Sequence, residues 1–394
     1  MKSRSKKLSK FLFKTPSETT STDYHHQPNI VKAGAAIMKK FRTSQEVVVL
    51  AEMQSGKTEV MRRMIYLVNN HNEELHRMNV TIDRFNVWVV LSASSIQLKE
   101  QLQTKLPEIK HNIYHLTDIN SMLKNLAESD SILTQMSDSG LVIFDECHCD
   151  AEIGKIIDKF RQMLGRIARQ NETSYYILSS SASPYEQLNV AYPKVIMRPG
   201  SDYYGLRQMF EAKIPIVFPS KKLADPTQCL ELFTEIEICC FYYIFRLADR
   251  KDDSDQMITN IETEFRKRGV GIDSFIYDMS YRGNINEIIQ TQPNKPVVIY
   301  LKDKLRMGEY LDTTYVYVVH DDPCNCYTHT TIQSLLGRCC GYNKKANKTI
   351  IYCDYEKALE HYEWIKNDYD LRSIPSHAKY VSKTYNGNKD ICIY

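Results

Sequence analysis

Short runs of consecutive apolar residues, many of them β-branched, recur along this chain and alternate with helical patterns. A strand that is apolar at every position is buried on both faces, as in a parallel sheet covered by helices, whereas a half-exposed strand alternates apolar and polar residues. The runs fall into two sets, and the segment between them, 236–268, is predicted to be mainly helical. The first set comprises residues 47–50, 87–91, 141–144 and 175–178, and the second comprises 274–277, 297–300, 316–319 and 349–352. The sequence therefore predicts an α/β fold with two mainly parallel sheets, each flanked by helices.

Length and composition agree with a two-domain protein that does not span a membrane. A chain of 394 residues suits two cores of about 150–200 residues each. No window offers the roughly 18 uncharged apolar residues that a membrane helix needs, and the longest apolar-rich stretch, Ile236–Phe245, is predicted to be a buried helix. The 11 cysteines lack the rhythm of a disulfide framework, which indicates a reducing compartment and an intracellular protein of the cytoplasm or nucleus.

The chain divides into four expected segments. These are a flexible basic N-terminal arm (1–25), a first domain (26–205), a second domain (206–360) and a C-terminal extension (361–394). The first 14 residues carry six lysines and arginines and no acid, so the rest of the chain has a net charge of about −3. Such an arm can hold an anionic polymer or serve as an address, but a solvated terminus without a specific role is the more common reading.

The segment 51–58 follows the first predicted strand and opens a helix, which is the context of a phosphate-binding loop. Backbone N–H groups at a helix N-terminus point at an anion, and the helix dipole favours negative charge there. Gly56 allows a tight turn, Lys57 can neutralise the β- and γ-phosphates, and the Thr58 hydroxyl can ligate Mg²⁺. Ala51 stands where the usual pattern has its first glycine. We predict an ATP and Mg²⁺ site formed by Gln54, Ser55, Gly56, Lys57 and Thr58.

A pair of carboxylates, Asp145 and Glu146, follows the apolar run 141–144. Parallel α/β folds place their chemistry at the carboxyl ends of the strands, so both acids are expected at the same sheet edge as the 51–58 loop. An acid pair at a strand end is more often a helix cap, but its place about 90 residues after Lys57, in the same strand context, favours catalysis. Asp145 would order Mg²⁺ together with Thr58, and Glu146 would orient the attacking water.

These segments, in this order and spacing, resemble the motifs of superfamily 2 helicases of the DExH-box type, over roughly residues 27–355. The matching segments are 51–58 for motif I, 92–94 with Gln97 and Gln101 for motif Ia, 145–148 for motif II, 181–184 for motif III, 305–308 for motif V and 333–338 for motif VI. Motifs I and II are specific together, whereas motifs Ia and V are weak matches.

The resemblance implies two RecA-like domains with ATP in the cleft between them. It implies that Gly308 and Gln333 help to bind the nucleotide and that Arg338 reaches the γ-phosphate from the second domain. The implied activity is that of a nucleic-acid-dependent ATPase, a helicase or translocase acting on single- or double-stranded nucleic acid. The phrases at 203–205, 305–308 and 337–342 are similar to a compact branch found in phages and large DNA viruses, which favours DNA as the partner and a virus-encoded protein.

The sequence departs from the family pattern at several positions. Gly341 stands where motif VI has a second arginine, Gln333 lies one residue early, and motif IV is not recognisable between 206 and 273. ATP hydrolysis is therefore expected, whereas strand separation and oligomeric state stay undecided. Arg306 either adds positive charge at the phosphates or forms a structural salt bridge. Gln27 is either an adenine-binding residue or, more commonly, a loop glutamine.

Two other classes of function stay open. The chain is compatible with the motor subunit of a larger restriction or packaging complex, which would have protein partners. It is also compatible with a binding or assembly protein that keeps the fold but has lost turnover, as the missing second arginine suggests. Cys324, Cys326, Cys339 and Cys340 are either zinc ligands or, as is more common, small apolar residues.

Overall fold

The computed structural model describes residues 27–91, 96–145, 156–182, 192–305, 310–323, 328–342 and 349–376, with the backbone alone at 96, 97, 329 and 371. The chain divides into two compact units, the first ending at Ser201 and the second beginning at Asp202. This division lies close to the predicted domain boundary at residue 205. Each unit is built around a sheet of its own.

The first unit contains a parallel sheet with the strand order β3-β2-β4-β5-β1-β6 within its described residues. Its strands are β1 (Glu46–Ala51), β2 (Val87–Leu91), β3 (Ile113–His115), β4 (Leu141–Asp145), β5 (Tyr176–Ser181) and β6 (Lys194–Met197). Its helices are α2 (Pro28–Phe41), α3 (Lys57–Asn70), α4 (Asn72–Arg77), α5 (Ile96–Lys105), α6 (Leu116–Lys124), α7 (Leu126–Ser137), α8 (Ile156–Gln170) and the 3-10 helix η1 (Pro107–Asn112).

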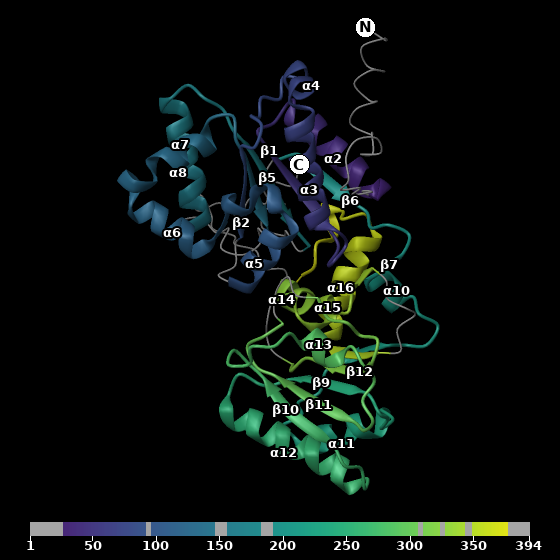
Figure 1. Ribbon diagram of the computed structural model, residues 1–394. Helices are drawn as coiled ribbons and strands as arrows, with labels where there is room; N and C mark the ends of the chain where they lie inside the picture. The colour runs from purple at the N-terminus through teal and green to yellow at the C-terminus, as the bar shows by residue number, and fades with distance from the viewer. Residues whose placement is uncertain are drawn as a thin grey trace, which may run out of the picture. The chain divides into compact units, whose positions relative to one another are not determined.

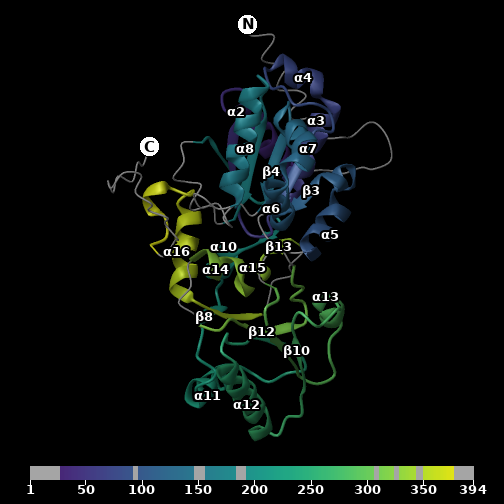
Figure 2. The same cartoon turned by 90° about the vertical axis from the view of Figure 1, so that its left-hand side faces the viewer.

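Helices cover both faces of this sheet (Figures 1 and 2). The helices α6, α7 and α8 pack against β2, β4 and β5 through one apolar cluster, in which Phe160 of α8 and Phe144 of β4 are fully buried. The helices α2 and α3 lie on the opposite side of the sheet, as both views show. Burial on both faces explains why β1, β2 and β4 are buried at every position.

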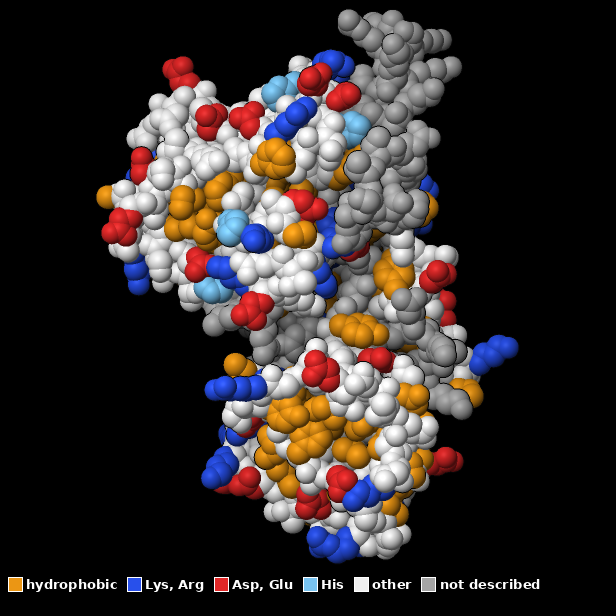
Figure 3. Space-filling model, viewed as in Figure 1, with side chains coloured by type: hydrophobic (Ala, Val, Ile, Leu, Met, Phe, Trp, Pro, Cys, Tyr) orange, Lys and Arg blue, Asp and Glu red, His pale blue; other side chains and the backbone are white. Residues whose placement is uncertain are grey.

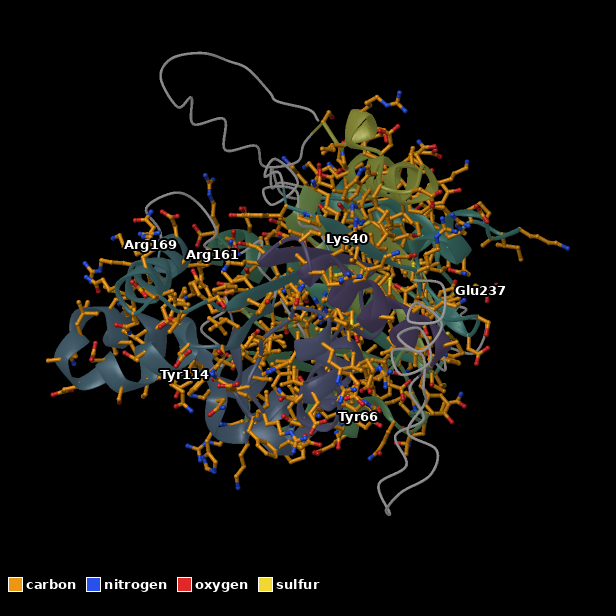
Figure 4. The ribbon with its side chains drawn as sticks, turned by 90° about the horizontal axis from the view of Figure 1, so that it is seen from above. Lys40, Tyr66, Tyr114, Arg161, Arg169 and Glu237 are labelled. Carbon is orange, nitrogen blue, oxygen red and sulfur yellow. The ribbon has the colours of Figure 1, made fainter. Side chains whose placement is uncertain are left out.

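A partly buried ion pair ties α8 to two strands of the first sheet. Arg161 Nη1 lies 2.6 Å from Glu46 Oε1, at the start of β1, and its Nη2 donates to Ser179 Oγ of β5 at 2.8 Å. Figure 4 shows Arg161 and Arg169, both on α8; Arg169 is exposed to solvent. Because Arg161 bonds to both β1 and its neighbour β5, it ties these two strands to the helical layer.

The second unit contains a parallel sheet with the order β10-β11-β9-β12-β14-β8, again among described residues. Its strands are β8 (Val217–Pro219), β9 (Tyr242–Arg246), β10 (Asp273–Tyr277), β11 (Val297–Leu301), β12 (Val316–His320) and β14 (Ile350–Cys353), and the antiparallel pair is β7 (Tyr203–Tyr204) with β13 (Gly341–Tyr342). Its helices are α10 (Leu206–Phe210), α11 (Pro226–Glu235), α12 (Lys251–Lys267), α13 (Ile285–Ile289), α14 (Thr328–Gln333), α15 (Leu335–Arg338), α16 (Tyr355–Lys366) and the 3-10 helix η2 (Leu371–Ser373).

The helices α11 and α12 cover one face of the second sheet through a cluster that includes Phe265 and Tyr243, and α13 to α16 lie on the other side (Figures 1 and 2). Apolar side chains gather on the face of this unit that Figure 3 shows. The edge strand β10 contributes exposed apolar surface, because Ile276 is 45% exposed, and Met279 in the following loop is 74% exposed. The helix α16 spans position 361, where the C-terminal extension was expected to begin.

These sheets confirm the predicted fold class, two mainly parallel sheets flanked by helices, and the arrangement is consistent with two RecA-like domains. Every apolar run that we predicted as a strand is one, with ends that differ by at most three residues. The prediction of a buried helix at Ile236–Phe245 was wrong. Residues 242–246 form β9, the strand between β11 and β12, and only 251–267 of the segment is helical.

The error at β9 has a physical reason. A strand buried on both faces and a buried helix are both apolar at nearly every position, so periodicity does not separate them. The sequence did offer one signal for a strand, because residues 242–245 are all aromatic or β-branched. In the structure each of these four residues is at most 5% exposed.

Candidate nucleotide-binding site

The turn between β1 and α3 has the backbone geometry expected of a phosphate-binding loop. β1 ends at Ala51 and α3 begins at Lys57. Gly56, immediately before the helix, has φ +106°, a conformation that disfavours any residue with a Cβ atom, and Gln54 has φ +57°. The Ser55 hydroxyl donates to the carbonyl of Glu52 at 2.7 Å, which closes the turn on itself. The turn therefore brings the chain directly onto the N-terminus of a helix of 14 residues.

The predicted binding residues of this turn differ in exposure. Ser55 is fully buried, and its hydroxyl supports the turn from within. Gln54, Gly56, Lys57 and Thr58 are partly exposed. Lys57 and Thr58 are thus partly accessible at the helix start, where a phosphate and its cation are expected.

Asp145 lies at the same edge of the sheet as the turn. It is the last residue of β4, and β5 lies between β4 and β1. On β5, Ser181 pairs with Leu50 of β1, and the preceding residue, Ser180, pairs with Asp145 of β4. The Ser180 hydroxyl also donates to Asp145 Oδ1 at 3.4 Å. Because neighbouring strands are about 4.8 Å apart, the ends of β1 and β4 are separated by roughly 10 Å. The structure therefore brings Lys57 and Asp145 to one carboxyl edge, while Glu146 lies outside the described residues.

The helix α2 packs on the start of α3. A Cβ atom at Gly56 would lie 3.2 Å from Ile30 Cδ1, and one at Gly34 would lie 2.7 Å from Arg63 Cγ. Gln27 directly precedes α2, accepts the backbone N–H of Ile30 through its carbonyl at 2.9 Å, and is exposed. The glutamine suggested as an adenine contact is thus near the turn in the fold, and its role stays a prediction.

A cation near this edge was missed in the sequence. Lys105 ends α5, and its carbonyl accepts a hydrogen bond from Arg62 Nε of α3 at 2.7 Å. Burial lowers the pKa of Lys105, and the negative charges of Glu59 and Asp145 oppose that shift. The electrostatic interaction with Asp145 shows that Lys105 belongs to the surroundings of the candidate site; no spacing rule in the sequence pointed to it.

In the second unit, Gln333 and Arg338 contact each other. Arg338 is fully buried on α15, and its Nη2 donates to the Gln333 carbonyl at 2.8 Å and lies 3.5 Å from Gln333 Oε1. The predicted nucleotide contact Gln333 therefore supports the side chain of the predicted catalytic arginine. The role of Arg338 at a γ-phosphate stays a prediction.

Gly341 explains the missing second arginine of motif VI. Its φ is +142°, and it pairs with Tyr204 in the antiparallel ribbon β7–β13. The next pair, Tyr203 and Tyr342, packs its rings edge to face at 5.5 Å between centroids. A residue with a side chain is strained at this backbone conformation, so the glycine serves the ribbon. The segments 203–205 and 337–342, two of the three that resemble the viral branch, are thus paired in the structure.

Sequence reasoning also missed an ion pair at the carboxyl edge of the second sheet. Arg246, the last residue of β9, lies 2.7 Å from Asp321, which follows β12. The neighbouring acid Asp322 has its pKa raised to about 6 by burial and by the charges of Asp249 and Asp253. Recognising residues 242–246 as a strand would have placed Arg246 at this edge, in the interval where motif IV was not recognised.

Several sequence predictions lie outside the described residues. They are the basic arm 1–25, the motif Ia serine segment 92–94, residues 146–148, the end of motif III at 183–184, Arg306 and Gly308, and Cys324 and Cys326. Cys339 and Cys340 are buried, and the described part of the chain contains no group of three His, Cys, Asp or Glu side chains arranged to hold a metal ion. No described helix combines the length and apolar composition needed to span a bilayer.

The fold and the site together define an α/β protein of two parallel-sheet units, the first of which carries a glycine turn and a carboxylate at one sheet edge. The chain belongs to the family of the "Uncharacterized protein L594" of Acanthamoeba polyphaga mimivirus, to which it is 54% identical over 387 residues, 98% of this chain and 99% of the relative. A viral relative agrees with the resemblance to a viral branch. No model of a known protein family matches the chain.

A solved structure is similar in fold only. It is a fragment assigned to the HsdR subunit of a type I restriction enzyme from Vibrio vulnificus, with 14% sequence identity and a TM-score of 0.49, over 93% of this chain and 70% of that chain.

Proposed function

We propose that this protein is a nucleic-acid-dependent ATPase of the superfamily 2 helicase type. The observation that carries the proposal is the turn of β1 into α3, with Gly56 at φ +106°, beside Asp145 at the same carboxyl edge. A strand, a glycine turn and a helix N-terminus make an anion site, and a carboxylate two strands away supplies an anchor for a cation. Lys57 adds the positive charge that a triphosphate requires.

The residues at this edge fit a Mg²⁺ ion in type and position. Thr58 and Asp145 offer oxygen ligands, which Mg²⁺ prefers, and the roughly 10 Å between the two strand ends leaves room for coordinating waters and phosphate oxygens. Ser180 donates to Oδ1 of Asp145 at 3.4 Å, a contact that helps to orient the carboxylate at this edge. Bound Mg²⁺ would supply charge neutralisation at the β- and γ-phosphates.

The chain's own residues would act on the triphosphate as follows. The N–H groups of the turn and Lys57 hold and neutralise the phosphates, and Glu146 accepts a hydrogen bond from the attacking water and aligns it with the γ-phosphorus. Arg338 offsets the charge that develops in the transition state. Gly308 and Gln333 are proposed to complete the nucleotide contacts, and nucleic acid, DNA in preference to RNA, is the proposed partner that stimulates turnover.

A second candidate function is nucleotide-dependent binding or assembly without turnover. It is favoured by the internal engagement of Arg338, which is fully buried and donates to Gln333, and by Gly341 in the place of a second arginine. In this case ATP binds at the Lys57 turn, but its hydrolysis is slow whatever nucleic acid is present. The motor-subunit alternative differs from both in needing a protein partner for stimulation.

The deciding experiment measures ATP hydrolysis by the full chain alone and with single- and double-stranded DNA and RNA. Lys57→Ala should abolish hydrolysis, because it removes the phosphate-neutralising charge. Lys40→Ala is the matched control, since Lys40 is an exposed lysine in the last turn of α2, a helix of the same unit (Figure 4). Stimulated turnover that Lys57→Ala removes and Lys40→Ala retains supports the ATPase. ATP binding that depends on Lys57 without turnover supports the second candidate, and ATP binding unaffected by Lys57→Ala contradicts both.

A further inference from the structure

The pair Arg246 and Asp321 joins three elements at the carboxyl edge of the second sheet. Arg246 uses its whole guanidinium group. Nε lies 2.7 Å from Asp321 Oδ1, Nη1 donates to the Lys304 carbonyl at 2.9 Å, and Nη2 donates to the Leu305 carbonyl at 3.1 Å. The two side chains of the pair are only 12% and 11% exposed. Arg246 thus fixes the backbone at Lys304 and Leu305, in the segment that follows β11.

Asp321 connects the same pair to the helix that carries Arg338. Its Oδ1 accepts from the Ser334 hydroxyl at 2.9 Å, and its Oδ2 accepts from the backbone N–H of Leu335 at 3.0 Å. Ser334 is the N-cap of α15. Both carboxylate oxygens therefore receive hydrogen bonds from the start of α15 while one also pairs with Arg246. The register of α15 is set by the same ion pair that holds 304–305.

The backbone held by Arg246 is conformationally strained. Asp303 and Leu305 have φ +58° and +56°, a region that residues with side chains rarely adopt. Lys304 between them is 4% exposed, and its Nζ donates to the Tyr281 carbonyl at 2.6 Å. Such strain persists only where surrounding contacts over-determine the conformation. The two hydrogen bonds from Arg246 are contacts of this kind, so the segment is expected to relax when they are lost.

We infer that Arg246 and Asp321 are positioning residues that hold the backbone of Lys304 and Leu305 and the helix of Arg338 in place for ATP hydrolysis, an inference that rests on the proposed function. Neither side chain is assigned a contact with the nucleotide. The pair acts through the backbone carbonyls of Lys304 and Leu305 on one side and through the N-terminus of α15 on the other. Its loss should therefore lower turnover and leave the affinity of the Lys57 turn for ATP unchanged.

The variant Arg246→Lys tests the positioning role of the pair while it retains the positive charge. A lysine keeps the ion pair with Asp321 but lacks the planar fork that reaches both carbonyls. Misplacement of a catalytic group by about 1 Å costs on the order of 100-fold in rate. We expect Arg246→Lys to lower the nucleic-acid-stimulated kcat by about that factor at unchanged KM for ATP. Ser334→Ala, which removes one of the hydrogen bonds to Asp321, should give a smaller loss in the same direction.

Arg268→Lys is the matched control. Arg268, also in the second unit, pairs with Glu264 at 2.5 Å and donates to the Phe233 carbonyl at 3.1 Å, on the α11–α12 layer of the sheet. Its substitution removes the same kind of forked contact and should lower thermal stability comparably, with turnover per folded molecule unchanged. If Arg246→Lys and Arg268→Lys have equal turnover per folded molecule, the pair has only a structural role and the inference is wrong.

Amide hydrogen exchange separates this inference from the proposed function. Arg246→Lys should raise exchange in residues 302–305 and 334–340 of the full chain, and Arg268→Lys should not. A wild-type protein without ATPase activity would overturn the proposed function, and the exchange result would still decide whether the pair holds these segments. Unchanged exchange in both segments of Arg246→Lys would overturn the inference whatever the ATPase result.

Discussion

Replacing Gly56 by alanine tests the turn that joins β1 to α3. The φ angle of +106° at Gly56 is one that costs an L-residue about 1–2 kcal/mol. A Cβ atom would also lie 3.2 Å from Ile30 Cδ1 and 4.0 Å from Glu59 Cβ, so the crowding is confined to the tip of one flexible side chain. We therefore expect Gly56→Ala to destabilise the first unit by about 1–2 kcal/mol, with the backbone conformation as the main cause.

This loss has two measurable consequences. A domain of this size loses about 2–4 °C in Tm per kcal/mol, so thermal unfolding of the first unit should shift down by roughly 2–8 °C. Relief of the strain also moves the N–H groups at the start of α3 away from a bound phosphate. Losing one hydrogen bond to a charged group costs about 1.5–3 kcal/mol, so calorimetric titration with a non-hydrolysable ATP analogue should show affinity reduced by about tenfold or more.

Gly269→Ala is the control for backbone strain alone. Gly269 has φ +70°, follows α12 in the second unit, and has open space around its Cβ position. Its alanine variant should lose comparable stability and keep its affinity for the ATP analogue. The reasoning fails if Gly56→Ala unfolds at the wild-type temperature and binds the analogue normally. Equal loss of affinity in both variants would show a general effect of destabilisation and no specific role for the turn.

Three further predictions concern residues beyond the turn. Glu146→Gln should retain ATP binding and block hydrolysis in a single-turnover assay, because the amide no longer accepts the water's proton; reduced nucleotide affinity would count against a water-positioning role. Arg338→Ala should bind ATP and lose about 10³-fold or more in turnover. If Arg338 has only a structural role through its bond to Gln333, the variant will instead have a lower Tm and unchanged turnover per folded molecule. Deleting residues 1–14 should flatten the salt dependence of nucleic-acid binding without changing turnover, and an unchanged slope would show that the arm does not contact the polymer.

The fold could be predicted from sequence wherever burial was uniform and the turn chemistry was explicit. The run 87–91 is β2, buried at every position, and 141–144 lies in β4. Among the strands that were not predicted, the short strand β3 was missed because three residues carry no period. The central strand β9 was missed because a strand buried on both faces has the composition of a buried helix. Local sequence signals therefore located the strands that are bounded by clear turn residues. They failed where a strand was too short to show a period or where its composition did not separate it from a buried helix.

The sequence by itself determined the α/β class, the glycine turn before Lys57 and the placement of Asp145 at a strand end, because each depends on neighbours within a few residues. Only the tertiary structure decided that Arg246 pairs with Asp321, 75 residues away, and that Gly341 stands where an arginine was expected because it pairs with Tyr204. The order of strands in a parallel sheet determines which strand ends become neighbours. That order follows from the packing of all the helices and strands together, and no local pattern in the chain encodes it.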